Sequence, residues 1–144
     1  MIFYSKKNVH RLSKFLNKKI NLIDIGSQGG LFGWLKDIEK IINKIEFDFY
    51  SSSKDSELLF DKESYQDFYE CENLKQSSIF KPNKKFAKYE MQYSRLNFTQ
   101  RKKIKTFRLD QKLIDKNEQI DVIKIDTQGS EYQILKGSIQ TIKK

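Results

Sequence analysis

The sequence predicts an α/β fold, a mostly parallel sheet with helices on both faces, and two segments of similar build carry this prediction. Residues 20–30 run from an apolar stretch into a glycine-rich turn, and residues 121–137 run from an apolar stretch through a turn into a helix start. Buried strands that alternate with helices are typical of parallel sheets, because each return to a parallel strand requires a crossover. No internal repeat or linker divides the chain, so we expect residues 1–144 to form one domain.

The first half of the chain is predicted to alternate helices and strands. Within an N-terminal helical segment at 1–19, apolar residues recur at helical spacing among lysines. This pattern favours a helix packed on the domain over a helix on a membrane surface, because the apolar face is short. Further elements are expected as a strand over 20–25, a helix over 31–43 and a strand over 45–50.

The second half is less regular. Residues 51–55 are predicted to be a loop that leads into a short helix through Leu58 and Leu59. Beyond it we expect a strand over 65–69, turns at 77–78 and 81–83, a strand over 103–109, a short helix over 110–115, a strand over 120–125 and a helix from about Ser130. A doubly wound sheet normally continues with another strand after such a helix, so we expect a partial domain that lacks the final strands.

The composition excludes a disordered chain and weakens a role in nucleic-acid binding. Hydrophobic residues make up 38% of the chain, and the net charge of +9 raises nucleic acid or an anionic membrane as partners. The charge comes from 24 scattered lysines and only 4 arginines, however, and arginine is the residue that reads bases. With a single cysteine, Cys71, and no apolar run long enough for a signal peptide or a membrane span, we expect a cytoplasmic protein.

The first turn, Asp24-Ile-Gly-Ser-Gln-Gly-Gly30, has the composition of a ligand-binding loop. It follows a predicted strand directly and precedes a predicted helix. Gly26, Gly29 and Gly30 permit a tight turn and a close approach of the backbone to a ligand. The spacing is not Gly-x-Gly-x-x-Gly, which argues against a pyrophosphate such as NAD and favours a nucleoside such as S-adenosylmethionine. The alternative is a glycine-rich turn that binds nothing.

The next predicted strand ends in an acid that suits a ribose. Asp48 lies 24 residues after Asp24, and dinucleotide sites place an acid that binds the ribose hydroxyls about 20 residues on. Glu46 competes for this role, because alternation along a strand puts it on the same face as Asp48. The position of Asp48 nearer the strand end favours Asp48.

The second turn supplies two candidate catalytic acids. Asp126 ends a buried strand, where open α/β sheets place their chemistry, and could act as a general base. Glu131 lies in the first turn of the helix that follows, where the helix dipole alone favours an acid. Both residues have a structural alternative, since helix caps and turns use the same side chains.

Other candidates for chemistry are weaker. His10, the only histidine, lies in the predicted N-terminal helix and is better explained as a surface or partly packed side chain than as a general base. Asp110, Asp126 and Glu131 could together hold Mg²⁺, but three acids distant in sequence are slight evidence. We therefore expect no metal site.

The two turns together resemble those of the FkbM family of S-adenosylmethionine-dependent methyltransferases. The matching segments are Asp24–Gly30, in which Ser27 and Gln28 stand where relatives most often have Ala and Asn; Phe47-Asp48-Phe49; Ser77-Ser78; Leu109-Asp110; and Asp121–Gly137. The resemblance covers roughly residues 20–137. It implies a Rossmann-like class I methyltransferase fold, with S-adenosylmethionine held by Asp24, Gly26, Ser27, Gln28, Gly30 and Asp48.

The resemblance also implies an activity, O-methylation of a sugar or another small hydroxylated metabolite. Two alternatives stay open. A truncated domain could bind S-adenosylmethionine without turnover, and its exposed sheet edge would then invite homodimerisation. A nucleic-acid methyltransferase is less well supported, because that class usually carries an Asn/Asp-Pro-Pro-aromatic run where this chain has Asp126-Thr-Gln-Gly129.

Overall fold

The computed structural model describes residues 16, 18–26, 28, 30–31, 33–50, 58–83, 85, 97–114 and 119–143. The predicted N-terminal helix with His10, the loop at 51–55 and the turn residues Ser27 and Gly29 lie outside these residues, apart from single positions at 16, 18 and 19. None of the helices within the described ranges is long and apolar enough to cross a membrane.

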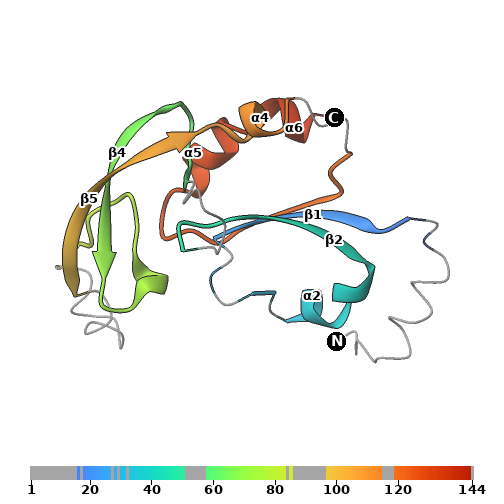
Figure 1. Cartoon of the computed structure of the whole chain (residues 1–144), viewed down its shortest axis with the longest axis horizontal. Helices are drawn as coiled ribbons and strands as arrows, with labels where there is room; N and C mark the ends of the chain where they lie inside the picture. The colour runs from blue at the N-terminus through green and yellow to red at the C-terminus, as the bar shows by residue number, and fades with distance from the viewer. Residues whose placement is uncertain are drawn as a thin grey trace.

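A parallel sheet of order β2-β1-β6 forms one half of the structure (Figure 1). Its strands are β1 (Ile20–Ile25), β2 (Ile42–Phe47) and β6 (Val122–Ile125), and β1 pairs in parallel with both neighbours. β1 is central because it pairs on both sides, and its residues from Leu22 to Ile25 are all buried. The reversal of strand order around β1 leaves a crevice at the carboxyl ends of the strands, which is where open sheets bind ligands.

A second sheet of order β3-β5-β4 lies beside the first (Figure 1). It contains β3 (Leu58–Leu59), β4 (Ser64–Cys71) and β5 (Phe98–Phe107); β3 pairs with β5 in parallel, and β4 pairs with β5 in antiparallel orientation. A short 3₁₀ helix, η2 (Leu74–Gln76), follows β4. Among the described residues most strand pairings are parallel and the helices are short and few, so the fold is α/β with a mostly parallel sheet.

Helices pack on opposite sides of β1 (Figure 1). On one side lie α2 (Trp34–Asp37) and the 3₁₀ helix η1 (Glu39–Ile41), and on the other lie α4 (Leu109–Lys112), α5 (Glu131–Lys136) and α6 (Ile139–Ile142). One buried cluster contains Leu22, Leu31, Leu35, Ile38 and Ile42. The other joins both sheets and contains Ile23, Ile25, Leu59, Leu109, Leu113 and Ile134.

Four predicted elements differ in detail from the structure. The helix expected over 31–43 is reduced to α2 and η1, and the strand expected over 45–50 begins at Ile42, because apolar residues there also suit a strand buried beside β1. Leu58 and Leu59 form β3 rather than a helix, since they pair with the end of β5. The predicted strand over 65–69 lies within β4, but it pairs antiparallel in the second sheet.

The remaining predicted elements agree with the structure to within a few residues. The strands expected over 20–25 and 120–125 correspond to β1 and β6, and the helix from about Ser130 corresponds to α5. The strand expected over 103–109 starts earlier, at Phe98, and ends at Phe107. The short helix expected over 110–115 is α4, which begins one residue earlier.

Candidate functional site

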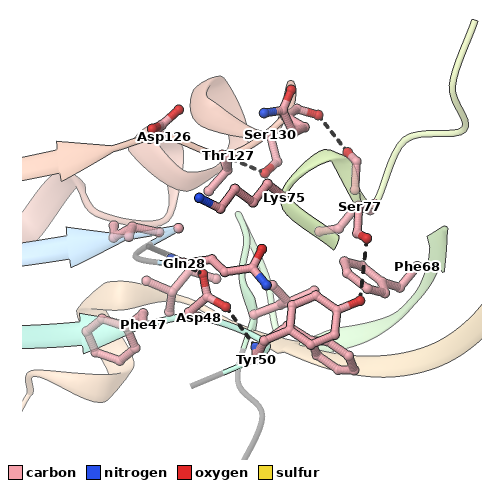
Figure 2. A pocket seen from close by; sticks show the side chains of 18 of the residues that line it. Gln28, Phe47, Asp48, Tyr50, Phe68, Lys75, Ser77, Asp126, Thr127 and Ser130 are labelled. Atoms are coloured by element: carbon pink, nitrogen blue, oxygen red, sulfur yellow. Dashed lines mark hydrogen bonds between the residues drawn. The ribbon is translucent and has the colours of Figure 1, made fainter. Parts of the chain in front are cut away.

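A pocket of about 250 Å³ opens at the carboxyl ends of β1, β2 and β6 (Figure 2). The first sheet contributes Gly26, Gln28 and Asp48 to its lining, and the turn after β6 contributes Asp126. The second sheet contributes the opposite wall through Phe68 and residues 74–79. The pocket therefore lies between the two sheets, and four of the predicted site residues meet there although they are far apart in the sequence.

Gly26 lies where the ends of the three parallel strands meet. Its backbone N–H donates to the carbonyl of Phe47 at 2.9 Å, and the backbone N–H of Asp126 donates to the carbonyl of Ile25 at 3.0 Å. Gly26 has a φ of 74°, and a Cβ atom at this position would collide with the backbone carbonyl of Asp126. Only glycine meets both requirements, so the turn predicted from the sequence depends on this residue.

Asp48 holds the glycine turn against the segment that follows β2. Its buried carboxylate accepts one hydrogen bond from the backbone N–H of Gln28 at 3.0 Å and another from that of Tyr50 at 2.7 Å. Each carboxylate oxygen can accept a second bond, so capacity for ligand hydroxyls is left. The competing Glu46 does not line the pocket and instead pairs with Lys44 at 2.7 Å, which raises the pKa of Lys44.

Asp24 does not line the pocket and takes part in a buried ion pair beneath it. The Lys124 ammonium donates to Asp24 Oδ1 at 2.7 Å and to the carbonyl of Gly26 at 3.3 Å. Asp24 is 0% exposed, and its Oδ2 has no hydrogen-bond partner in the described part of the chain. The two residues lie opposite each other in the register of β1 and β6, so the pair connects the two strands that carry the turns.

Asp126 lies at the rim of the pocket. Its side chain is 59% exposed, and one carboxylate oxygen lies 4.0 Å from the Lys124 ammonium. Figure 2 shows the Asp126 carboxylate beyond Thr127, on the opposite side of Lys75 from Asp48. The position leaves Asp126 accessible to a molecule bound in the pocket.

Glu131 does not line the pocket, and neither does Gly30. Glu131 Oε1 accepts hydrogen bonds from the backbone N–H groups of Thr127 and Gly129, both at 3.2 Å. Its carboxylate therefore stabilises the turn that carries Asp126. This is the structural alternative that the sequence left open for an acid in the first turn of a helix.

Aromatic side chains form a wall of the pocket that the sequence interpretation missed. Phe49 and Phe68 lie 4.6 Å apart between ring centroids, and Tyr50 packs edge-on against Phe49 at 5.0 Å. The Tyr50 hydroxyl donates to Glu70 at 2.9 Å. Burial, with the neighbouring Glu70 and Asp48 charges, raises the pKa of Tyr50 to about 12. The signal in the sequence was the run of aromatic residues around Asp48.

Ser78 links the second sheet to the Asp126 turn. Its hydroxyl donates to the carbonyl of Gln128 at 2.6 Å and accepts from the backbone N–H of Phe80 at 3.0 Å. The neighbouring Ser77 accepts from the backbone N–H of Cys71 at 3.1 Å. Ser78, one of the serine pair noted in the sequence through the family resemblance, thus holds the two sides of the pocket together.

The three acids considered as Mg²⁺ ligands do not lie together at one site. Asp110 accepts hydrogen bonds from the backbone N–H and hydroxyl of Thr141, both at 2.9 Å, and binds Arg108 at 3.1 Å. It therefore caps α6 rather than facing the pocket. No group of three or more His, Cys, Asp or Glu side chains among the described residues is placed to hold a metal ion.

The fold and the pocket define an α/β protein with a ligand site at the carboxyl edge of a parallel sheet. The family model described as the methyltransferase FkbM domain matches residues 58–144, which is more than half of the chain. The chain therefore belongs to the FkbM methyltransferase family. The match includes the second sheet and the Asp126 turn and begins after the glycine turn and Asp48. No curated protein and no solved structure matches the chain.

Proposed function

We propose that the chain transfers the methyl group of S-adenosylmethionine to a hydroxyl of a small hydroxylated molecule such as a sugar. The observation that carries this proposal is the meeting of Gly26, Gln28, Asp48 and Asp126 in one pocket. The first three suit a nucleoside cofactor, and the fourth suits an acceptor hydroxyl. The strand order β2-β1-β6, with helices on opposite sides of β1, supports the Rossmann-like class I fold that the family resemblance implies.

The residues that line the pocket fit the cofactor. The second lone pairs of the Asp48 carboxylate would accept from ribose hydroxyls, and the backbone at Gly26 leaves room for a close approach. Phe49 and Tyr50 would pack against the adenine ring, since aromatic faces stack on bases.

The cofactor, when bound, supplies a methyl group on a sulfonium that a nucleophile displaces in one step. The chain's own contribution is to align an acceptor hydroxyl and to remove its proton. We expect the Asp126 carboxylate to accept that proton, because it is exposed at the pocket rim. Glu131, predicted to be catalytic, is better suited to hold the turn of Asp126 through Thr127 and Gly129.

Binding of the cofactor without turnover is the second candidate. The exposure of the Asp126 side chain favours it, because a general base is usually enclosed with its substrate. The homodimer predicted through a sheet edge belongs with this candidate. Within the described residues β6 pairs only with β1, and size-exclusion chromatography of the full chain would test whether its other edge joins two copies.

The proposal is tested by calorimetric titration of the full chain with S-adenosylmethionine. We expect the wild type to bind and Asp48→Asn to bind at least about ten-fold more weakly, because an amide replaces a charged acceptor. Asp61→Asn, a carboxylate outside the pocket, is the matched control and should bind like the wild type. Absence of wild-type binding would contradict the proposal.

Turnover is tested by the release of S-adenosylhomocysteine in the presence of hydroxylated acceptors. Asp126→Asn should abolish release while leaving cofactor affinity within about two-fold of wild type, because its role begins with the acceptor. Cofactor binding without release from any acceptor would favour the binding-only candidate.

A further inference from the structure

A lysine from η2, the 3₁₀ helix that follows β4, extends into the pocket from a turn that hydrogen bonds hold in place. Lys75 is the middle residue of η2, and the Asn73 side chain accepts from its backbone N–H at 3.2 Å. The Gln76 N–H donates to the carbonyl of Asn73 at 2.8 Å, which fixes the same turn. Figure 2 shows the Lys75 side chain extending from η2 toward the space between Thr127 and Gln28.

Lys75 is the one cationic side chain among the described residues that line the pocket, beside the two carboxylates of Asp48 and Asp126. Asp48 is engaged by two backbone N–H groups, and Asp126 lies 4.0 Å from the Lys124 ammonium. The structure gives the Lys75 ammonium no hydrogen bond or ion pair with any described residue. A positive charge in a pocket without a protein partner is available to a ligand.

We propose that the acceptor carries a carboxylate or phosphate group and that Lys75 binds this anion. The proposal rests on the proposed function and specifies its substrate class. The groups that suit the cofactor, Gly26 and Asp48, come from the first sheet, whereas Lys75 comes from the wall opposite them. Lys75 is therefore placed to recognise the acceptor, whose hydroxyl would lie toward Asp126.

The experiment compares two acceptors that differ in charge, glucuronate and glucose, by calorimetric binding to the full chain with and without S-adenosylmethionine. Wild type should bind glucuronate about ten-fold more tightly than glucose, in line with a single charge-assisted hydrogen bond. Lys75→Gln should lose the preference, and Lys75→Arg should retain most of it. The control variant is Lys40→Gln, because Lys40 is an exposed lysine in the middle of η1. It should keep the wild-type preference for glucuronate over glucose.

The outcomes separate this inference from the proposed function. Failure of S-adenosylmethionine to bind wild type would reject the proposed function, while the acceptor preference measured without it would still test Lys75. Equal or unmeasurable binding of both acceptors by wild type would overturn the inference, as would a preference unchanged in Lys75→Gln. A ten-fold loss of S-adenosylmethionine affinity in Lys75→Gln would also overturn it, because the cofactor's own carboxylate would then be the partner.

Discussion

The two sheets of this protein are stabilised in opposite ways. The first sheet has short parallel strands, with 6 residues in β1 and 4 in β6, and its central strand is buried. The second sheet has an antiparallel pair, with 8 residues in β4 and 10 in β5, and much of β5 is exposed. The first sheet places one ion pair inside the protein, Asp24 with Lys124, whereas the second carries its ion pairs on the surface between β4 and β5.

Because of this difference, the two sheets contribute different kinds of residues to the pocket. Burial fixes the strand ends of the first sheet. The residues proposed to bind the cofactor and to accept a proton are therefore held in place by a tightly packed sheet. The second sheet contributes a wall whose serine, aromatic and lysine side chains face that sheet. We expect substitutions in the first sheet to damage both stability and binding, and substitutions on the surface of the second to do less.

The largest effect is expected from Lys124→Met. This substitution removes the ammonium and leaves the Asp24 carboxylate buried without compensation, which costs about 3–5 kcal/mol for pairs of this kind. Because domains of this size are stable by about 5–15 kcal/mol, the variant should lose a large share of its free energy of unfolding. Urea unfolding followed by circular dichroism measures the loss.

A second variant shows whether the instability of Lys124→Met comes from an unpaired buried charge or from lost packing. The double substitution Asp24→Leu with Lys124→Met replaces both charges with apolar groups and should recover most of the stability lost in Lys124→Met. Equal instability of the single and double variants would contradict the view that an uncompensated charge is the cause.

The second-largest loss of stability is expected in the Gly26 turn, where the ends of the parallel strands meet. Gly26→Ala introduces strain at a φ of 74° and a collision with the Asp126 carbonyl. We expect the free energy of unfolding to fall by about 2–4 kcal/mol and S-adenosylmethionine binding to be lost. Gly30→Ala is the matched control, since Gly30 has a φ of 76° but open space around its Cβ position. It should cost only about 1–2 kcal/mol. Equal losses in the two variants would show that contact with Asp126 is unimportant.

The sequence predicted the first sheet better than the second for a physical reason. β1 and β6 are apolar runs followed by turns, so local pattern and burial agree. The start of β2 was misplaced because Ile41 and Ile42 fit a helical face and a strand equally well. The second sheet depends on pairing between β4 and β5, which are distant in the sequence, and its exposed charged residues conceal the alternation that marks a strand.

The same distinction applies to the pocket. Asp48 and Asp126 were predicted as site residues because an acid at the end of a buried strand is a local signal, and both line the pocket. Asp24, near the end of a buried strand, and Glu131, in the first turn of a helix, also carry local signals, but they bind Lys124 and the Thr127 turn, which no local pattern distinguishes. Lys75 was missed, because its position depends on the non-local pairing of β4.

The third effect lies between two helices, where Asp110 connects α4 to α6. Burial alone would raise the pKa of Asp110, but hydrogen bonds from Thr141 and Gln140 outweigh it and lower the pKa below its ordinary value. A carboxylate with a lowered folded-state pKa stabilises the protein above its unfolded-state pKa of about 3.9, and this contribution is lost as the pH falls through the folded-state pKa.

Stability should therefore decline below about pH 4, and Asp110→Asn should cost about 2 kcal/mol at pH 7 while flattening that decline. Urea unfolding measured from pH 7 down to pH 3 checks both expectations. Asp37→Asn removes one exposed carboxylate from α2 and controls for the change in net charge. An acid decline of the same slope in Asp110→Asn and wild type would assign it to other groups.

The smallest effect is expected from Lys102→Met, the same substitution as in the first sheet made at an ion pair of the second. Lys102 is 38% exposed and binds Glu70 at 2.6 Å, and its hydrogen bond lowers the pKa of Glu70. Glu70 would keep its bonds from Gln100 and Tyr50, so the expected loss is about 0.5–1 kcal/mol, and it should shrink further in 1 M NaCl. A loss as large as that of Lys124→Met would mean that the surface pairs of β4 and β5, rather than burial around β1, hold the pocket together.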